Sequence, residues 1–227
     1  MRESAISFWA GVRAELPLLI GVFPFGFIYG ALALSAGLSP AAAQLMSSIV
    51  FAGSSQFAAA QLIHDSAPAL VIVVTIAMIN LRHMLYSASM APYIHDLSMR
   101  WKSLLAYLLT DEAYAATVIH YQQDGITSTS HWFFLGAGLA LWTTWQLSSA
   151  LGIFLGASLP SSWPLDFALP LTFIAMVMPS LKDRPTVAAA LSAGAVALPA
   201  YVLPYKLGFI LAALVGIAVG VFLESRR

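Results

Sequence analysis

The sequence contains no cysteine and very few charged residues. Without cysteine the chain has no disulfide, no thiolate metal site and no cysteine nucleophile. Cysteine content therefore does not indicate whether the protein works in an oxidising or a reducing compartment. Only 9% of its 227 residues are charged, against roughly 25% in soluble domains. Lysine plus arginine equals aspartate plus glutamate at ten each, so no excess of one sign points to nucleic acid. Any chemistry must therefore come from acids, histidines, arginines, hydroxyls and amides.

Apolar residues dominate instead, at 60% of the chain with a mean hydropathy of +0.84. A soluble protein of this size would lack the polar surface to cover its core, whereas a bilayer accepts apolar side chains outside. The first apolar run, from Leu16, is longer than a signal-peptide core and contains Pro17 and Pro24. We expect it to be retained, and the sequence predicts an all-α, polytopic helical bundle in a membrane.

Stretches approaching the roughly 20 residues of a membrane helix recur along the whole chain: 14–36, 41–63, 68–90, 102–122, 131–159, 164–181, 186–204 and 207–223. The connections are short, so we expect one membrane domain over 1–227 with six to eight segments. With a cytoplasmic N-terminus, Arg100 and Lys102 join the cytoplasmic charges if 41–63 and 164–181 are re-entrant or broken. That arrangement has six crossings.

A faint repeat accompanies this pattern: "FGFIYGA" at 25–31 returns as "LGIFLGA" at 151–157. It divides the chain into halves at 14–122 and 131–223. Three crossings would separate the two copies, which predicts inverted repeats of the kind found in secondary transporters. The alternative is that spaced glycines occur at any close helix interface.

Polar residues interrupt the segment 68–90 at Asn80, Arg82, His83 and Tyr86. On a helix Asn80 and His83 share one face, while Arg82 and Tyr86 share another about 200° away. A charged arginine exposed to lipid costs about 2.5–3.5 kcal/mol even on the lenient insertion scale. This helix must therefore lie between other helices or border a water-filled cavity.

Two adjacent acids, Asp111 and Glu112, follow Thr110 near the middle of 102–122. Arg82 lies eight residues before its segment ends, and Asp111 lies nine after Lys102 begins the next, so two antiparallel neighbours would bring them level. We therefore predict that Arg82 pairs with Asp111 or Glu112. The pair alone could simply hold two helices together. Since one acid is surplus, it is also a candidate proton carrier. His83 is a candidate second carrier, and the alternative is that this histidine is merely hydrogen-bonded.

The stretch 47–61 is rich in small residues and has Ser54, Ser55 and Gln56 at its centre. Gly53 is a candidate break. If the helix unwinds there, free N–H groups at the new helix start, with the serine hydroxyls and the Gln56 amide, would suit a carboxylate. The alternative is that these small residues only allow close packing.

Several catalytic motifs are missing from the sequence. It has no phosphate-binding G-x-x-x-x-G-K-[ST] loop, no H-E-x-x-H and no G-x-S-x-G elbow. We expect no enzyme, no metal and no cofactor. An intramembrane serine hydrolase using Ser54 or Ser55 with His83 remains a distant alternative.

Three motifs in order, "FAGSSQF" (51–57), "NLRHMLYSASMAP" (80–92) and "LLTDEAYA" (108–115), stand behind a "PFGFIYG" (24–30) opening. Together they resemble the AzlC family over essentially the whole chain. The resemblance implies a permease of the bacterial inner membrane that exports branched-chain amino acids. It also implies that the chain is the larger subunit beside a small hydrophobic partner of the AzlD type.

A small zwitterion needs cationic or N–H groups for its carboxylate, an acid or amide for its ammonium and an apolar wall. Without an ATPase motif, transport would be secondary. The competing reading is a structural or assembly subunit that transports nothing. Candidate substrate-binding residues are Ser54, Ser55, Gln56, Asn80, Arg82 and Tyr86. Candidate proton-coupling residues are Asp111, Glu112 and His83.

Overall fold

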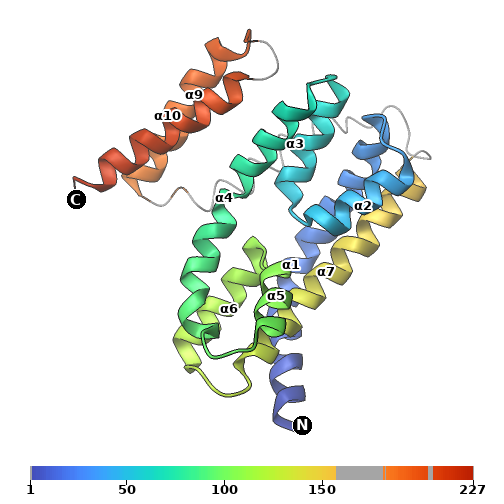
Figure 1. The fold of residues 1–227 in the computed structure, drawn as a ribbon, viewed down its shortest axis with the longest axis vertical. Helices are drawn as coiled ribbons and strands as arrows, with labels where there is room; N and C mark the ends of the chain where they lie inside the picture. The colour runs from blue at the N-terminus through green and yellow to red at the C-terminus, as the bar shows by residue number, and fades with distance from the viewer. Residues whose placement is uncertain (1, 157–180, 182, 204–206, 227) are drawn as a thin grey trace.

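The computed structural model describes residues 2–156, 181, 183–203 and 207–226, and every element within them is a helix (Figure 1). The predicted all-α class is confirmed for these residues. Apart from Leu181, the stretch 164–181 that we expected to be re-entrant or broken lies outside them. The helices are α1 (Arg2–Ser35), α2 (Pro40–Val50), α3 (Gly53–His64), α4 (Ala69–Ile94), α5 (Met99–Tyr107), α6 (Asp111–Asp124), α7 (Ser130–Leu155), α9 (Arg184–Ala200) and α10 (Leu207–Glu224).

The centre of the fold is the contact between α1 and α7, which run side by side in the same direction (Figure 1). Glycines make this contact close. A Cβ atom at Gly11 would lie 2.0 Å from the Phe133 carbonyl oxygen, and one at Gly152 would lie 2.0 Å from the Phe27 carbonyl oxygen. Since any larger side chain would separate the two backbones, the glycines set the helix spacing.

Helices α2 and α3 form a hairpin that turns between Val50 and Gly53. Both helices contact the same residue of α1, Tyr29. Its hydroxyl donates to the Ala43 carbonyl of α2 (2.8 Å), and its ring lies 6.0 Å from the Phe57 ring of α3. The turn contains Phe51 in the left-handed region, at φ 40°. The predicted break at Gly53 is confirmed, since α3 begins there.

Helices α5 and α6 form a second hairpin, and this corrects the expectation of one continuous helix over 102–122. The open end of this hairpin lies at the start of α7: the Trp101 and Trp132 rings are 5.0 Å apart, and the Tyr121 hydroxyl donates to the Ser130 carbonyl (2.7 Å). The chain leaves the helix after Tyr107 and restarts at Asp111 because Thr110 caps α6, accepting from the Ala113 N–H (3.4 Å).

Helix α4 connects the two hairpins, which lie near its opposite ends (Figure 1). Two aromatic contacts show the relative direction of α4 and α6. Tyr86 stacks on Tyr114 at 4.6 Å, and seven residues further along both helices Tyr93 lies 5.4 Å from Tyr121. Helices α4 and α6 are therefore parallel, not antiparallel as the depth argument assumed. Helices α1 and α4 are each long and apolar enough to cross a membrane.

The predicted inversion of the repeat is also corrected. The copy at 25–31 lies in α1 and the copy at 151–156 lies in or directly after α7, where Gly156 approaches Ala31. Because α1 and α7 are parallel, the two copies point the same way. The prediction was wrong because it counted 102–122 as a crossing, whereas the chain folds back within it.

Helices α9 and α10 pack on each other as an antiparallel pair. A Cβ atom at Gly208 would meet the Ala200 carbonyl oxygen at 2.1 Å, while one at Gly216 would lie 2.9 Å from the Ala193 Cβ. Residues further along α10 therefore contact residues further back along α9, which shows that the two helices are antiparallel. Their exposed faces carry large apolar side chains, as a lipid-facing surface requires.

Candidate functional site

The turns of the two hairpins meet beside the middle of α4 and enclose a cavity with α1 and α7. The centre of a water-sized sphere can move through about 40 Å³ inside it, which is room for a few water molecules, and the cavity opens to the outside. Its walls combine apolar and aromatic side chains with charged and hydroxyl groups. The lining residues are Val22, Phe25, Phe51, Ala52, Gly53, Ser54, Arg82, His83, Thr110, Asp111, Glu112, Leu141 and Trp145.

Two helix N-termini contribute to this cavity, because α3 and α6 both begin at the hairpin turns. At α6 the first turn carries its own acids, Asp111 and Glu112, which complement the positive end of the helix dipole. At α3 the cap residue is Ala52, which has no side chain to accept from the first N–H groups. The start of α3 therefore presents backbone donors to the cavity beside Ser54.

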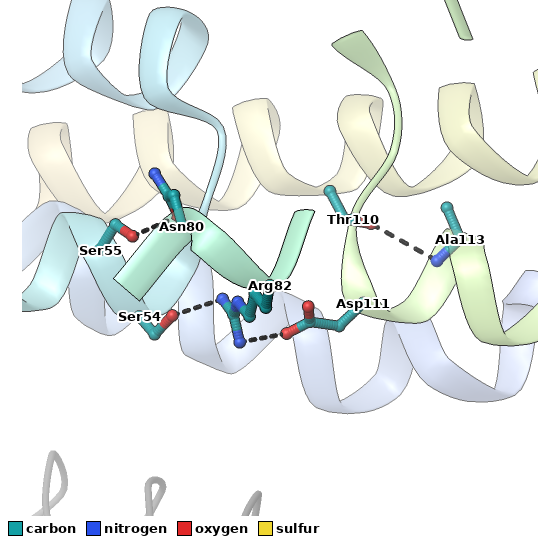
Figure 2. Close-up of polar contacts among 7 residues, drawn as sticks. All are labelled: Ser54, Ser55, Asn80, Arg82, Thr110, Asp111 and Ala113. Carbon is teal, nitrogen blue, oxygen red and sulfur yellow. Dashed lines mark hydrogen bonds and ion pairs between the residues drawn. The ribbon is translucent and has the colours of Figure 1, made fainter. Parts of the chain in front are cut away.

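Arg82 joins the two hairpins (Figure 2). Its Nη1 lies 2.6 Å from Asp111 Oδ2, and its Nη2 donates to Ser54 Oγ at 2.5 Å. The side chains of Arg82 and Asp111 are 27% and 29% exposed, so the pair is neither sealed nor fully open. The sequence predicted that Arg82 pairs with Asp111 or Glu112. The structure selects Asp111, adds Ser54 as a third member and shows that α4 and α6 meet as parallel helices.

Three further sequence candidates lie around this pair. Glu112 lines the cavity, so the two acids of α6 have different surroundings: Asp111 is bound to Arg82, and Glu112 faces the space beside it. His83 also lines the cavity, and its ring lies edge-on to Tyr86 at 5.9 Å. Tyr86 itself stacks on Tyr114 and is not a wall residue.

The other candidates support the cavity from behind. Ser55 donates to Asn80 Oδ1 at 2.6 Å, which ties the start of α3 to α4 (Figure 2). Gln56 is fully buried, and its Oε1 accepts from Trp145 Nε1 at 3.1 Å. None of these three side chains forms part of the cavity wall in this structure.

Neither serine of the serine hydrolase alternative is paired with a base in this structure. Ser54 Oγ accepts from Arg82, and Ser55 Oγ donates to Asn80. A serine nucleophile needs its hydroxyl in hydrogen-bond contact with a general base such as histidine. The hydroxyls here serve the hairpin contacts instead.

The structure places one acid near this site that the sequence analysis did not single out. Glu15, on α1, is fully buried, and both of its carboxylate oxygens are without a hydrogen-bond partner among the described residues. Glu112 lies within electrostatic range of it. The available signal was a lone acid inside the apolar segment 14–36, but nothing in the sequence shows which neighbour such an acid faces.

Tyr107 links the turns of the two hairpins outside the cavity. Its hydroxyl donates to the Ser48 carbonyl at 2.6 Å and accepts from Trp142 Nε1 at 2.7 Å, while its ring lies 5.9 Å from that of Phe51. The end of α5 is thereby fastened to the end of α2. This contact holds the two turns at a constant separation.

Substitution Tyr107→Phe is expected to lower the stability of the purified protein by about 1–2 kcal/mol, since it removes both hydrogen bonds of the hydroxyl. Thermal denaturation in detergent measures this. Tyr93→Phe is the matched control, because the Tyr93 hydroxyl makes no hydrogen bond within the described residues while its ring also packs on another tyrosine. Equal stability of the two variants would contradict the link.

Comparison with known proteins agrees with the motifs. The AzlC protein family model matches residues 17–159. The chain is 33% identical to a membrane protein of Archaeoglobus fulgidus over 92% of each chain. It is 27% identical to the inner membrane protein YgaZ of Escherichia coli, over 78% of this chain and 75% of that protein.

A third relative has a transport name. The chain is 27% identical to the branched-chain amino acid transport protein AzlC of Bacillus subtilis, over 73% of this chain and 66% of that protein. No solved structure matches it. The apolar helices α1 and α4 and the names of these relatives agree that this is a membrane protein. The family match over 17–159 and the three motifs that lie within it place this chain in the AzlC family.

Proposed function

We propose that this chain is the larger subunit of a secondary transporter that exports branched-chain amino acids across the bacterial inner membrane. The observation that carries the proposal is the cavity, where a cation, two acids, the uncapped start of α3 and apolar walls converge. A subunit that only assembles others would need these polar groups in closed pairs, and Glu112 stands outside the one ion pair of the site. The name of the Bacillus subtilis relative supports the substrate class.

The substrate carboxylate binds at the start of α3. The N–H groups of this first helical turn have no side-chain cap, and the positive end of the helix dipole favours an anion there. Arg82 lies next to it, held by Ser54 at 2.5 Å. Ser55, Asn80 and Gln56 keep this turn in position from behind, which is their part in substrate binding.

The substrate ammonium binds at Glu112, because Asp111 is already engaged by Arg82. The apolar side chain lies against Phe25, Leu141 and Trp145, which line the same cavity. This division of roles suits a small neutral amino acid and disfavours a charged side chain, which would find no partner on that wall. Glu112 and His83, which line the same cavity, exchange protons with it during the cycle.

In the membrane, α1, α4 and α7 cross the bilayer and the two hairpins enter from opposite sides. A cytoplasmic N-terminus then places Arg100 and Lys102, at the open end of the second hairpin, on the cytoplasmic side, as the distribution of positive charge favours. The chain works as one domain beside a small hydrophobic subunit of the AzlD type. The hairpin turns meet at mid-depth, where transporters commonly bind substrate.

Leucine counterflow in proteoliposomes tests this function, measured with and without a co-encoded small membrane protein. We expect exchange of labelled leucine that requires the partner, and a fall of about 30-fold in Asp111→Asn, which leaves Arg82 without its anion. Glu112→Gln is expected to lose both exchange and its pH dependence. Asp96→Asn and Glu224→Gln, on exposed carboxylates, are the controls. Unchanged, pH-dependent exchange in both cavity variants would refute the proposal.

A further inference from the structure

Glu15 is a buried acid for which the described part of the chain provides no hydrogen-bond partner. Its exposed fraction is 0%, and neither carboxylate oxygen has a hydrogen-bond partner among the described residues. Burying an ionised carboxylate without a cation or a hydrogen-bond donor costs on the order of several kcal/mol. A carboxylic acid that keeps its proton avoids most of this cost, so the burial implies a bound proton.

The charged groups around Glu15 do not offer it a cation. Helix α6 brings Glu112 into electrostatic range, with Asp111 beside it. On α7 the one titratable side chain is His131, whose ring packs on Trp101 at 4.7 Å, and α2 and the buried face of α3 carry none. On α4, Arg82 is bound to Asp111, and His83 lines the cavity on the side of Glu112. His120, also on α6, is paired with Asp124 at 2.7 Å. Among the described residues, the charged group that acts on Glu15 is therefore another acid and not a cation.

The position of Glu112 gives Glu15 a route to the cavity. Glu112 lines the cavity wall and lies within electrostatic range of Glu15, so it links the buried acid to the substrate space. Two carboxyl groups that repel each other in a low-dielectric site favour holding a proton over ionising together. A proton that leaves one of them is consequently taken up by, or passed through, the other.

We propose that Glu15 binds the coupling proton of transport and that Glu112 passes this proton between Glu15 and the cavity. In the state described, the proton is held on a Glu15 oxygen, sealed from solvent. When the cavity opens to water, the proton moves to a Glu112 oxygen and then to water, and the Glu15 carboxylate left behind is hydrated. This inference rests on the proposed transport function, because a proton is coupled only if a substrate moves.

A proton fits this place better than a metal cation. Sodium and larger cations need several oxygen ligands at once, usually with more than one carboxylate or with backbone carbonyls turned toward them. Among the described residues no group of three or more acids and histidines could hold a metal ion. Both Glu15 oxygens also lack any donor that would orient them as ligands.

The first test reads the proton directly, without transport. Infrared spectroscopy of the purified protein in lipid should show the carbonyl stretch of a buried carboxylic acid at neutral pH. Glu15→Gln should remove this band, whereas Glu3→Gln, an exposed acid on the same helix, should leave it. A band that survives unchanged in Glu15→Gln would overturn the proposal.

The second test separates coupling from substrate binding in proteoliposomes that contain the chain with its partner subunit. In Glu15→Gln, leucine accumulation driven by a pH gradient should fall about tenfold or more, the size of an ordinary coupling between two ligands. Leucine counterflow, which needs no net proton movement, should be retained, and Glu3→Gln should keep both. Undiminished pH-driven accumulation in Glu15→Gln, or accumulation driven by sodium instead, would contradict the proposal.

If Glu15→Gln loses counterflow as well, Glu15→Asp decides. Recovery of pH-driven accumulation by this shorter acid supports the proton role, and failure to recover in a folded protein makes Glu15 structural. The outcomes also separate this inference from the proposed function. A wild-type protein without counterflow would refute the transport function, while the infrared band would still report whether Glu15 holds a proton.

Discussion

Replacing Arg82 by glutamine is expected to reduce leucine counterflow at least about 30-fold, because truncating one partner of a desolvated charge pair costs about 2 kcal/mol or more. The substitution leaves Asp111 Oδ2 without the cation now 2.6 Å away and Ser54 without its donor. It also removes the cation nearest to the start of α3, where the substrate carboxylate binds. Counterflow per reconstituted protein, with the amount of protein determined separately, measures the loss.

Two further variants show whether Arg82 acts on the substrate or only on the fold. The double variant Arg82→Gln with Asp111→Asn removes both charges together, so it should restore stability while counterflow stays lost. Arg82→Lys should recover counterflow only in part, since a single ammonium cannot reproduce the planar contact with Ser54 and Asp111 at once. Full counterflow in the double variant would show that Arg82 is structural.

Replacing Gly152 or Gly30 by alanine is expected to destabilise the protein by about 1–3 kcal/mol, which corresponds to a fall of roughly 2–12 °C in Tm. The new methyl group would lie 2.0 Å from the Phe27 carbonyl oxygen in the first case and 2.3 Å from the Ser149 carbonyl oxygen in the second. Backbone atoms of packed helices cannot turn away, so α1 and α7 must separate. Thermal denaturation in detergent measures the effect.

Gly21→Ala is the matched control for these variants. Gly21 lies on the same helix α1, and a Cβ atom there would meet nothing within 4 Å. Alanine favours the helix over glycine by up to about 1 kcal/mol, so this variant should be as stable as the natural protein or slightly more. If Gly152→Ala matched Gly21→Ala in Tm, the α1 and α7 contact would not be a stabilising part of the fold.

The contact between Arg82 and Asp111 shows how sequence reasoning can find the right pair with the wrong geometry. The argument matched depths on two antiparallel helices, but 102–122 folds back after Tyr107, and α6 runs parallel to α4. Depth was still informative, because both side chains have to avoid lipid and both lie near the middle of their stretches. The direction of α6 depended on a turn at Leu108 and Leu109, two apolar residues that read as part of a helix.

The first hairpin was easier to anticipate than the second. Gly53 stands in a run of small polar residues, and glycine is a common place for a helix to break. The residue that carries the unusual backbone is Phe51, at φ 40°, where a bulky side chain is disfavoured. Its ring is buried beside Tyr107, so tertiary packing offsets the local strain. Backbone strain that is offset by contacts with a distant residue cannot be predicted from local propensity.

By itself, the sequence determined the class of the protein, its family motifs, the break before α3 and the residues that must avoid lipid, because hydropathy and the cost of buried charge act on each residue independently of its neighbours. Only the tertiary structure decided which segments fold back, that α1 and α7 are parallel, and that Glu15 is buried within electrostatic range of Glu112. These depend on contacts between residues far apart in the chain. A pattern along one helix contains no information about which helix will face it.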